Sequence, residues 1–317
     1  MHPMTETSLA TIRTDALDIA YEVSGPVGGP AVVLMHGFPY DVRAYDGVAP
    51  ALAAMGCRVV VPYLRGFGPT RFVDPSRSRS GQQAAIGADL RDLMRALDLG
   101  PAVLVGYDWG GRAACIVAAL WPELVRGLVT ANGYNIQNIA ASVHPLAPET
   151  EYRFWYGYYF HSGRGREGLR QNRRALTRLL WTLWSPTWWF DDDTFDRTAV
   201  SFENPDFVDV VVHSYRHRFG LVGGDPAYDA IEARLATTPV IAVPTIVLLG
   251  ADDGVDPPES EDDDVDSRDN GDFDGDESAQ PVEFTDLRDV RLVADAGHNL
   301  PQEQPHAVIA AVKELLV

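Results

Sequence analysis

Short apolar runs alternate with longer segments of helical periodicity along most of this 317-residue chain. The run Ala31-Val-Val-Leu-Met35 is apolar at every position, as expected of a strand that is buried on both faces of a sheet. Further strands are predicted over residues 9–13, 17–23, 58–62, 103–105, 125–131, 244–249 and 290–293, and helices over residues 45–55, 82–97, 113–120 and 305–316. Because strands alternate with helices, the pattern predicts an α/β fold with a mostly parallel, doubly wound sheet.

The alternation stops near Asn132 and resumes at about residue 241. The intervening residues 133–240 are rich in aromatic side chains and contain five of the seven tryptophans. Their helical spacing predicts an inserted helical cap, which leaves residues 1–132 and 241–317 as the α/β core.

An acidic segment interrupts the second part of the core. Residues 257–278 carry eleven acidic side chains and one basic side chain, Arg268. Because like charges repel and apolar groups are scarce, we predict that residues 257–281 form a flexible acidic loop. The tract 270–275 resembles half of a calcium-binding loop, but Pro281 stands where the bidentate glutamate would fall. A solvated insertion is therefore favoured over a calcium site.

The apolar run that ends at Gly106 leads into the tight turn Tyr107-Asp-Trp-Gly-Gly-Arg112 and then into a helix. A strand, a sharp turn and a helix form a nucleophile elbow, which lifts one side chain above the edge of the sheet. Here that side chain is Asp108. A carboxylate needs no base to become nucleophilic, so Asp108 suits attack on a saturated carbon to give a covalent ester. An ordinary strand-to-helix turn is the alternative that the other motifs must exclude.

A hydrolytic site on such an elbow needs a histidine and an acid later in the chain. The segment Gly250-Ala-Asp-Asp253 follows the predicted strand 244–249, which places a carboxylate at the carboxyl edge of the sheet. His298 is the one histidine of eight that follows a glycine between the last strand and the last helix. Water attack on the ester also needs oxyanion donors, and the backbone N–H groups of Phe38 and Trp109 are the expected ones.

Composition limits the classes of partner. The net charge of −19 disfavours nucleic acid and anionic membrane surfaces. Without a basic and apolar leader or a membrane-length apolar run, a cytoplasmic protein is expected. Cys57 and Cys115 fit reduced thiols better than a disulfide or a metal cluster, and no metal is expected. Lys313 is the only lysine, so the acidic surface indicates either adaptation to high salt or a coding bias toward arginine.

Four motifs occur in register along nearly the whole chain: His36-Gly-Phe-Pro39, Gly106-Tyr-Asp-Trp-Gly-Gly111, Gly250-Ala-Asp-Asp253 and Gly297-His-Asn-Leu-Pro-Gln302. Together they resemble the epoxide hydrolases of the α/β-hydrolase superfamily and their relatives, the haloalkane and haloacetate dehalogenases. The resemblance implies an α/β-hydrolase fold and a reaction without a cofactor. It also implies that Asp108 is the nucleophile, that His298 activates water and that Asp253 is the acid, with Asp252 as the less favoured alternative.

Two segments of the predicted cap, Tyr156-Gly-Tyr-Tyr-Phe160 and His213-Ser-Tyr-Arg216, resemble those that carry the epoxide-binding tyrosines of epoxide hydrolases. The resemblance implies that Tyr156 and Tyr215 donate hydrogen bonds to the epoxide oxygen and stabilise the developing alkoxide. For either ring, packing is the alternative role. The residues that the resemblance implies for the substrate site are His36, Pro39, Trp109, Tyr156 and Tyr215.

The expected reaction is the hydrolysis of a small hydrophobic epoxide by water to a vicinal diol. Hydrolytic dehalogenation of a haloalkane is the first alternative, with Trp109 and a cap tryptophan as halide donors. Phe38 argues against it, since haloalkane dehalogenases often carry a polar donor there. Trp109 also stands where haloacetate enzymes have an arginine, although Arg112 is kept. A ligand-binding protein without catalysis is the second alternative. The sequence leaves the oligomeric state open, a homodimer included.

Overall fold

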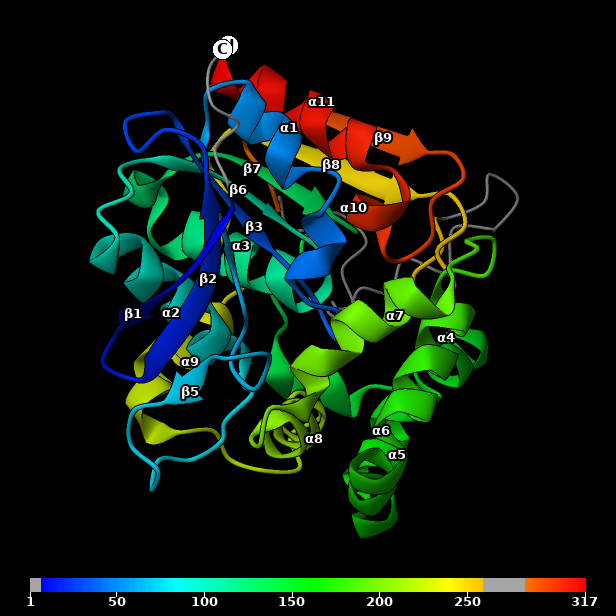
Figure 1. Cartoon of the computed structure of the whole chain (residues 1–317). Helices are drawn as coiled ribbons and strands as arrows, with labels where there is room; N and C mark the ends of the chain where they lie inside the picture. Colours follow the sequence, from blue (N-terminus) through cyan, green and yellow to red (C-terminus); the bar gives the residue numbers. More distant parts are fainter. Residues whose placement is uncertain (1–6, 259–282) are drawn as a thin grey trace, which may run out of the picture.

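A nine-stranded, mostly parallel sheet forms the centre of the computed structural model, which describes residues 7–258 and 283–317 (Figure 1). The strands are β1 (Ser8–Arg13), β2 (Leu17–Ser24), β3 (Ala31–Met35), β4 (Arg58–Pro62), β5 (Arg71–Phe72), β6 (Ala102–Gly106), β7 (Val125–Ala131), β8 (Thr245–Gly250) and β9 (Leu287–Val293). They follow the order β1-β2-β4-β3-β6-β7-β8-β9, and β5 pairs with β2. The pairs that involve β2 are antiparallel, whereas all pairs from β4 to β9 are parallel. The predicted α/β sheet is confirmed.

Burial along the strands follows their place in the sheet. Every residue of the central strand β6 is buried, which explains its uninterrupted apolar sequence. The edge strand β9 is mostly exposed and mixes polar with apolar residues. It begins at Leu287, before the predicted start at residue 290, because Leu287 already pairs with Thr245 of β8. Because polar residues interrupt the apolar ones along this exposed edge strand, the hydrophobic pattern of the sequence did not predict its first residues.

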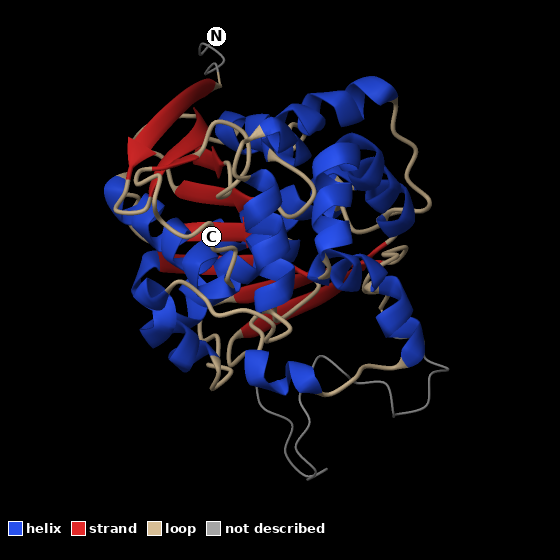
Figure 2. Cartoon of the chain, turned by 90° about the horizontal axis from the view of Figure 1, so that it is seen from below, coloured by secondary structure: helices blue, strands red, loops and turns tan. Residues whose placement is uncertain are grey.

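Helices surround the strands, as Figure 2 shows. Those of the core are α1 (Ala49–Ala54), α2 (Gln83–Ala96), α3 (Asp108–Leu120), α10 (Leu300–Glu303) and α11 (Pro305–Leu316). The single helix predicted over residues 45–55 is instead a 3₁₀ turn, Val42–Tyr45, followed by α1. Pro50 lacks an N–H to continue a helix from the preceding turn, so α1 starts anew beside it. None of the helices in the described part of the chain is long and apolar enough to cross a membrane.

The chain between β7 and β8 is mainly helical. Its helices are α4 (Pro148–Arg153), α5 (Trp155–His161), α6 (Gly163–Trp184), α7 (Asp192–Ala199), α8 (Phe207–His217) and α9 (Asp229–Leu235). Figure 1 shows α4–α8 grouped below and to the right of the sheet, and α5 packs against both α6 and α8. In contrast, α9 packs against α2 of the core. Residues 133–240, which the sequence predicts as the cap, thus include one helix, α9, that packs against the core.

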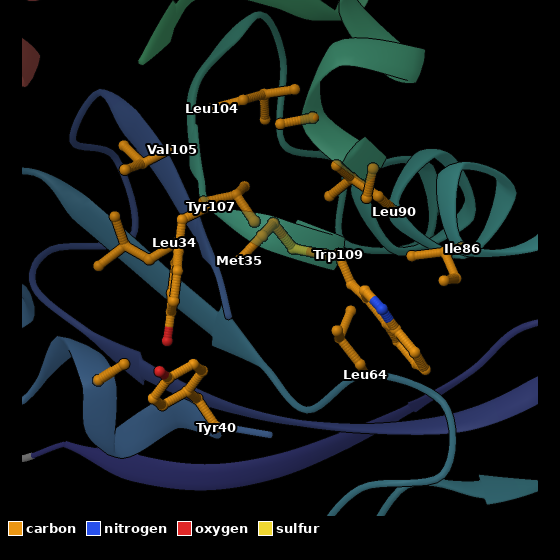
Figure 3. Close-up of a cluster of buried hydrophobic side chains, with 14 of the residues drawn as sticks. Leu34, Met35, Tyr40, Leu64, Ile86, Leu90, Leu104, Val105, Tyr107 and Trp109 are labelled. Atoms are coloured by element: carbon orange, nitrogen blue, oxygen red, sulfur yellow. The ribbon is translucent and has the colours of Figure 1, made fainter. Parts of the chain in front are cut away.

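Buried side chains surround the turn between β6 and α3 (Figure 3). Leu34 of β3 and Leu104 of β6 are fully buried, and so are the two residues that flank Asp108, Tyr107 and Trp109. A fully buried large apolar side chain contributes about 1.5–3 kcal/mol, so this packing is strong enough to hold a strained turn. The core therefore fixes the backbone from which Asp108 projects.

Candidate active site

Asp108 occupies the sharp turn between β6 and α3 with a backbone φ of 49°. This left-handed conformation costs a non-glycine residue about 1–3 kcal/mol, which the surrounding packing must offset. Two glycines allow the close approach. A Cβ at Gly110 would lie 2.1 Å from the Met35 carbonyl oxygen, and one at Gly106 would lie 2.4 Å from the Gly110 oxygen. The strand, turn and helix predicted around Asp108 are therefore present.

The two carboxylate oxygens of Asp108 have different surroundings. The Phe38 N–H donates to Oδ1 over 2.6 Å. Gly37 lies so near that an added Cβ would be 2.5 Å from the same oxygen. The Trp109 N–H lies in the first turn of α3, where N–H groups have no acceptor within the helix. The other oxygen, Oδ2, lies 3.7 Å from Nε2 of His298. A backbone amide thus holds Oδ1, and Oδ2 is on the histidine side.

The structure brings Asp108, His298 and Asp253 together from three separate loops. His298 Nδ1 lies 2.9 Å from Asp253 Oδ2, within hydrogen-bond distance. Asp253 is also held by the Asn132 side chain at 2.8 Å and the Val255 N–H at 2.8 Å. The alternative acid of the sequence prediction, Asp252, instead accepts a hydrogen bond from the Thr187 hydroxyl and does not contact His298. Geometry therefore favours Asp253 as the partner of the histidine.

Charge at the site favours a protonated His298 as long as both carboxylates are ionised. Burial disfavours the imidazolium, but the Asp253 and Asp108 carboxylates outweigh it and raise the pKa of His298 well above its ordinary value. Burial also acts against the Asp253 carboxylate, yet His298 and the Asn132 donor lower the pKa of Asp253 overall. Asp253 therefore stays ionised, and the state of His298 depends on the charge at Asp108.

The end of α6 joins the acid loop to the histidine loop. The Trp184 carbonyl oxygen accepts from the Gly254 N–H at 2.9 Å and from the His298 N–H at 3.1 Å. Trp184 and Asn132 were not among the residues predicted from sequence. Asn132 directly follows β7 at the same sheet edge as Asp108, with a φ of 66°, so its position could have indicated it. Trp184 gave no local signal among the tryptophans of the predicted cap.

Aromatic rings from the β7–β8 insertion cover this group. Tyr156 of α5 and Tyr215 of α8 are buried, with ring centroids 5.4 Å apart. Tyr215 packs against Phe38 at 5.6 Å and against Trp109 at 6.1 Å. Trp184 lies 4.8 Å from Tyr156 and 5.1 Å from the His298 ring. The two tyrosines predicted from distant segments therefore stand together over the turn that carries Asp108.

Several polar atoms in this enclosure have no hydrogen-bond partner among the described residues. They include the hydroxyl of Tyr215, Nε1 of Trp109 and Nε2 of His298, all of them buried. A buried polar group without a partner costs about 1–3 kcal/mol, and native proteins contain few of them. Their concentration around one carboxylate indicates groups that act on a bound molecule rather than on the fold.

Two other predicted substrate contacts, His36 and Pro39, make backbone contacts within the protein. Nδ1 of His36 lies 3.0 Å from the Gly37 carbonyl oxygen, and its Nε2 lies 3.1 Å from the Leu64 N–H. Burial lowers the pKa of His36 to about 4, so the ring is neutral. The Pro39 carbonyl oxygen accepts from the Trp181 indole at 2.8 Å. Both residues shape the loop that presents the Phe38 amide, and neither offers a polar side-chain atom to a substrate.

Residues 7–258 and 283–317 contain no group of three or more His, Cys, Asp or Glu side chains placed to hold a metal ion. The tract 270–275, which resembles half of a calcium loop, and most of the predicted acidic loop lie outside these residues. Cys57 and Cys115 are both buried free thiols.

Comparison with known proteins agrees with this geometry. Residues 30–300 match the α/β-hydrolase fold family, to which the chain therefore belongs. Within that family it is epoxide hydrolase-like: a Klebsiella pneumoniae protein provisionally assigned as an epoxide hydrolase has a structure with a TM-score of 0.89. The two sequences are 42% identical, and the alignment covers 97% of each chain.

Curated relatives match over shorter segments. The chain is 30% identical over 128 residues to epoxide hydrolase 4 of Mus musculus, which is 38% of this chain and 33% of the relative. It is 35% identical over 130 residues to a haloalkane dehalogenase of Mycobacterium marinum, which is 40% of this chain and 42% of the relative. The match thus spans about a third of the mouse relative. Because the curated relatives include both an epoxide hydrolase and a haloalkane dehalogenase, they do not distinguish between these two reactions.

Proposed function

We propose that this protein hydrolyses epoxides to vicinal diols through a covalent ester on Asp108. One observation carries the proposal: the Tyr215 hydroxyl is buried, has no partner among the described residues, and belongs to a ring packed against Phe38 and Trp109. Epoxide opening places negative charge on an oxygen, and a protonated phenol at that place is the donor it needs. The similarity to epoxide hydrolases supports the same substrate class.

In the first step, Oδ2 of Asp108 attacks one epoxide carbon, and the bond between that carbon and the ring oxygen breaks. The developing alkoxide accepts hydrogen bonds from Tyr156 and Tyr215, and one phenol gives it a proton. Burial raises the pKa of both phenols, so both are protonated at neutral pH before the reaction. The helical insertion that supplies these tyrosines is then a cap over the site, as the sequence predicts.

In the second step, His298 becomes a base because the ester has no charge. The pKa of His298 then falls, since one of the two carboxylates that raised it is lost, and the imidazolium gives its proton to the tyrosinate left by the first step. The neutral imidazole takes a proton from water, which attacks Cγ of Asp108, and the oxyanion rests on the N–H groups of Phe38 and Trp109. The ester bond breaks, the imidazolium protonates the departing diol, and the new carboxyl group of Asp108 gives its proton to His298, which restores the starting imidazolium and carboxylate.

A second candidate, haloalkane dehalogenation, is favoured by the buried and unpaired Nε1 of Trp109, a donor that suits a departing halide. The same Asp108, His298 and Asp253 would form and hydrolyse the ester. Phe38 adds no polar side chain for the halide. The hydrogen-bond donors of the site therefore suit a developing alkoxide better than a departing halide ion.

A paired assay tests both candidates. Diol formation from styrene oxide is measured against bromide release from 1-bromobutane, at low and at multimolar salt, because the charge of −19 supports a salt-adapted protein. We expect diol formation to dominate. Bromide release alone would replace the proposed function by the second candidate, and binding without turnover of either substrate would favour a ligand-binding protein.

A single turnover in ¹⁸O-labelled water tests the covalent route. Because water attacks Cγ, we expect the label in the side chain of Asp108, detected by mass spectrometry of its peptide. Label in the diol after the first turnover, with none in Asp108, would show direct attack of water on the epoxide.

A further inference from the structure

The backbone on both sides of His298 is held by two polar side chains. The Gly297 N–H, before the histidine, donates to Oε2 of Glu303 over 2.7 Å. The Asn299 N–H, after the histidine, donates to the hydroxyl oxygen of Ser185 over 3.3 Å. This hydroxyl in turn donates to Oε1 of Glu303 over 2.6 Å. One carboxylate and one hydroxyl thus form a continuous set of hydrogen bonds around the backbone that carries the imidazole.

Glu303 is held in this set by neutral donors. Within residues 7–258 and 283–317, no arginine, lysine or histidine side chain forms an ion pair with it. Burial raises the pKa of Glu303, although the Ser185 hydroxyl and the N–H groups of Gly297 and Asn299 act in the opposite direction. A carboxylate that is removed from water needs a cation or several hydrogen bonds. Here the donors of the histidine loop fill that need, so the acid is tied to this loop.

The end of α6 packs directly against both loops that supply the acid and the histidine. A Cβ at Gly297 would lie 2.5 Å from the Cα of Ser185, and a Cβ at Gly254 would lie 2.1 Å from the Leu183 carbonyl oxygen. A side chain at either glycine would therefore push the helix end away. Ser185 itself is buried. The position of the histidine loop thus depends on where this helix of the insertion ends.

We propose that Glu303 and Ser185 are positioning residues that hold His298 for hydrolysis of the covalent ester and connect it to the cap. Nδ1 of His298 must stay 2.9 Å from Asp253 while Nε2 faces the attacking water. A displacement of about 1 Å can cost about 100-fold in rate, so an imidazole on a loop needs this support. Formation of the ester uses the Asp108 carboxylate and needs no base. The proposal rests on the proposed function, because it assigns both residues to the second step.

Single-turnover kinetics separate the two steps. We expect Glu303→Ala to slow hydrolysis of the ester by about 10–100-fold and to leave its formation from styrene oxide within about 3-fold, because only hydrolysis needs a well-placed base. Mass spectrometry of the quenched Asp108 peptide follows both steps. The matched control is Glu314→Ala, which removes an exposed acid paired with Arg291 and should change neither step. Equal slowing of both steps would overturn the positioning role.

Glu303→Gln separates the position of the loop from the charge of the acid. The amide keeps an oxygen acceptor for the Gly297 N–H and offers its own N–H to the Ser185 hydroxyl oxygen. Hydrolysis in this variant should therefore stay within about 3-fold of the wild-type rate. If Glu303→Gln is as slow as Glu303→Ala, the charge of the carboxylate affects the base rather than the position of the loop, and the proposal is overturned.

Removing the Ser185 hydroxyl tests the connection to the cap. We expect Ser185→Ala to slow hydrolysis of the ester by about 5-fold and to leave its formation unchanged. Because Ser185 and Glu303 share one set of hydrogen bonds, the double variant should lose less than the product of the two single losses. A loss equal to that product would overturn the connection. Thermal melting checks the folding of every variant, and Ser185→Ala carries the test if Glu303→Ala does not fold.

A measurement without substrate keeps this inference separate from the proposed function. The proton between Nδ1 of His298 and Asp253 gives a downfield NMR resonance, which is followed in the full chain with ¹⁵N-labelled histidine. We expect its exchange with solvent to speed up by about 10-fold in Glu303→Ala and to stay unchanged in Glu314→Ala. An unchanged exchange rate in Glu303→Ala would overturn the inference even in a protein that hydrolyses epoxides. Faster exchange in a protein that hydrolyses no epoxide would refute the proposed function and keep the positioning of His298.

Discussion

The core side and the helical side of the site are built in different ways. On the core side, backbone geometry places the groups: a left-handed turn presents Asp108, and the Phe38 amide holds its Oδ1. On the helical side, Tyr156 and Tyr215 are placed by ring packing between α5 and α8. Backbone geometry fixes the reacting carboxylate within tight limits, whereas packing of side chains can change with the sequence of the insertion. In the proposed reaction, the core side thus defines the type of chemistry, and the helical side defines which substrate is bound.

Removing the carboxylate breaks the core side completely. We expect Asp108→Ala to lower kcat for styrene oxide by about 10⁴-fold or more, because no other group at this position can form the ester. Diol formation measures the loss, and thermal melting checks the fold. The matched control is Asp252→Ala, whose side chain contacts Thr187 instead of His298 and should leave kcat near that of the wild type. Substantial turnover by Asp108→Ala would refute the nucleophile assignment.

Replacing the histidine separates the two steps on the core side. In His298→Gln we expect one equivalent of ester to form and its hydrolysis to slow by about 10³-fold, since general-base catalysis is lost. Mass spectrometry should find the adduct on the Asp108 peptide. In the wild-type protein, hydrolysis of the ester should slow as the pH falls through the pKa of His298 in the ester, because the imidazolium cannot accept a proton. A variant that never accumulates the adduct would contradict this order of steps.

Removing one hydroxyl tests the helical side alone. Tyr215→Phe keeps the ring packing but removes the unpaired donor, so kcat for epoxides should fall by about 10²-fold. Tyr158→Phe, a partly exposed tyrosine of the same helical region, is the control. Bromide release from 1-bromobutane, if present, should be unchanged in Tyr215→Phe and reduced in Trp109→Phe. An equal loss for both substrates in Tyr215→Phe would indicate damage to the packing.

The buried carboxyl group of Asp41 links the core side of the site to the helical side. Its replacement should change the stability of the protein more than kcat. Asp41 accepts from Thr198 at 3.0 Å and from Ser201 at 2.5 Å. Burial raises the pKa of Asp41 to about 6, although these two hydrogen bonds act in the opposite direction and lower it. The folded protein therefore binds more protons than the unfolded chain between about pH 4 and 6, and the free energy of unfolding falls by about 2–3 kcal/mol as the pH rises through this window.

Asp41→Asn should remove that pH dependence, measured by denaturant unfolding at pH 4.5 and 8. The amide can still accept a hydrogen bond from one hydroxyl, so the fold is expected to persist. Asp15→Asn, at an exposed turn, is the control and should leave the pH dependence unchanged. If the free energy of unfolding still falls with rising pH in Asp41→Asn, other groups are responsible for the pH dependence.

Local sequence determined the main features of the core. Continuous apolar runs identified the buried strands, and the small residues around Asp108 identified the turn, because both depend on neighbours along the chain. The placement of His298 followed from its position after the last strand. These features were predictable since the backbone conformation of a strand or a tight turn is set within a few residues.

Tertiary structure decided the contacts between distant segments. It joined His298 to Asp253 rather than to the adjacent Asp252, brought the Trp184 carbonyl to the N–H groups of both Gly254 and His298, and placed α9 on the core. Such contacts depend on how helices far apart in sequence pack against the sheet, and no local pattern carries that information. Only the folded chain determines which polar groups remain unpaired, and these groups carry the proposed chemistry.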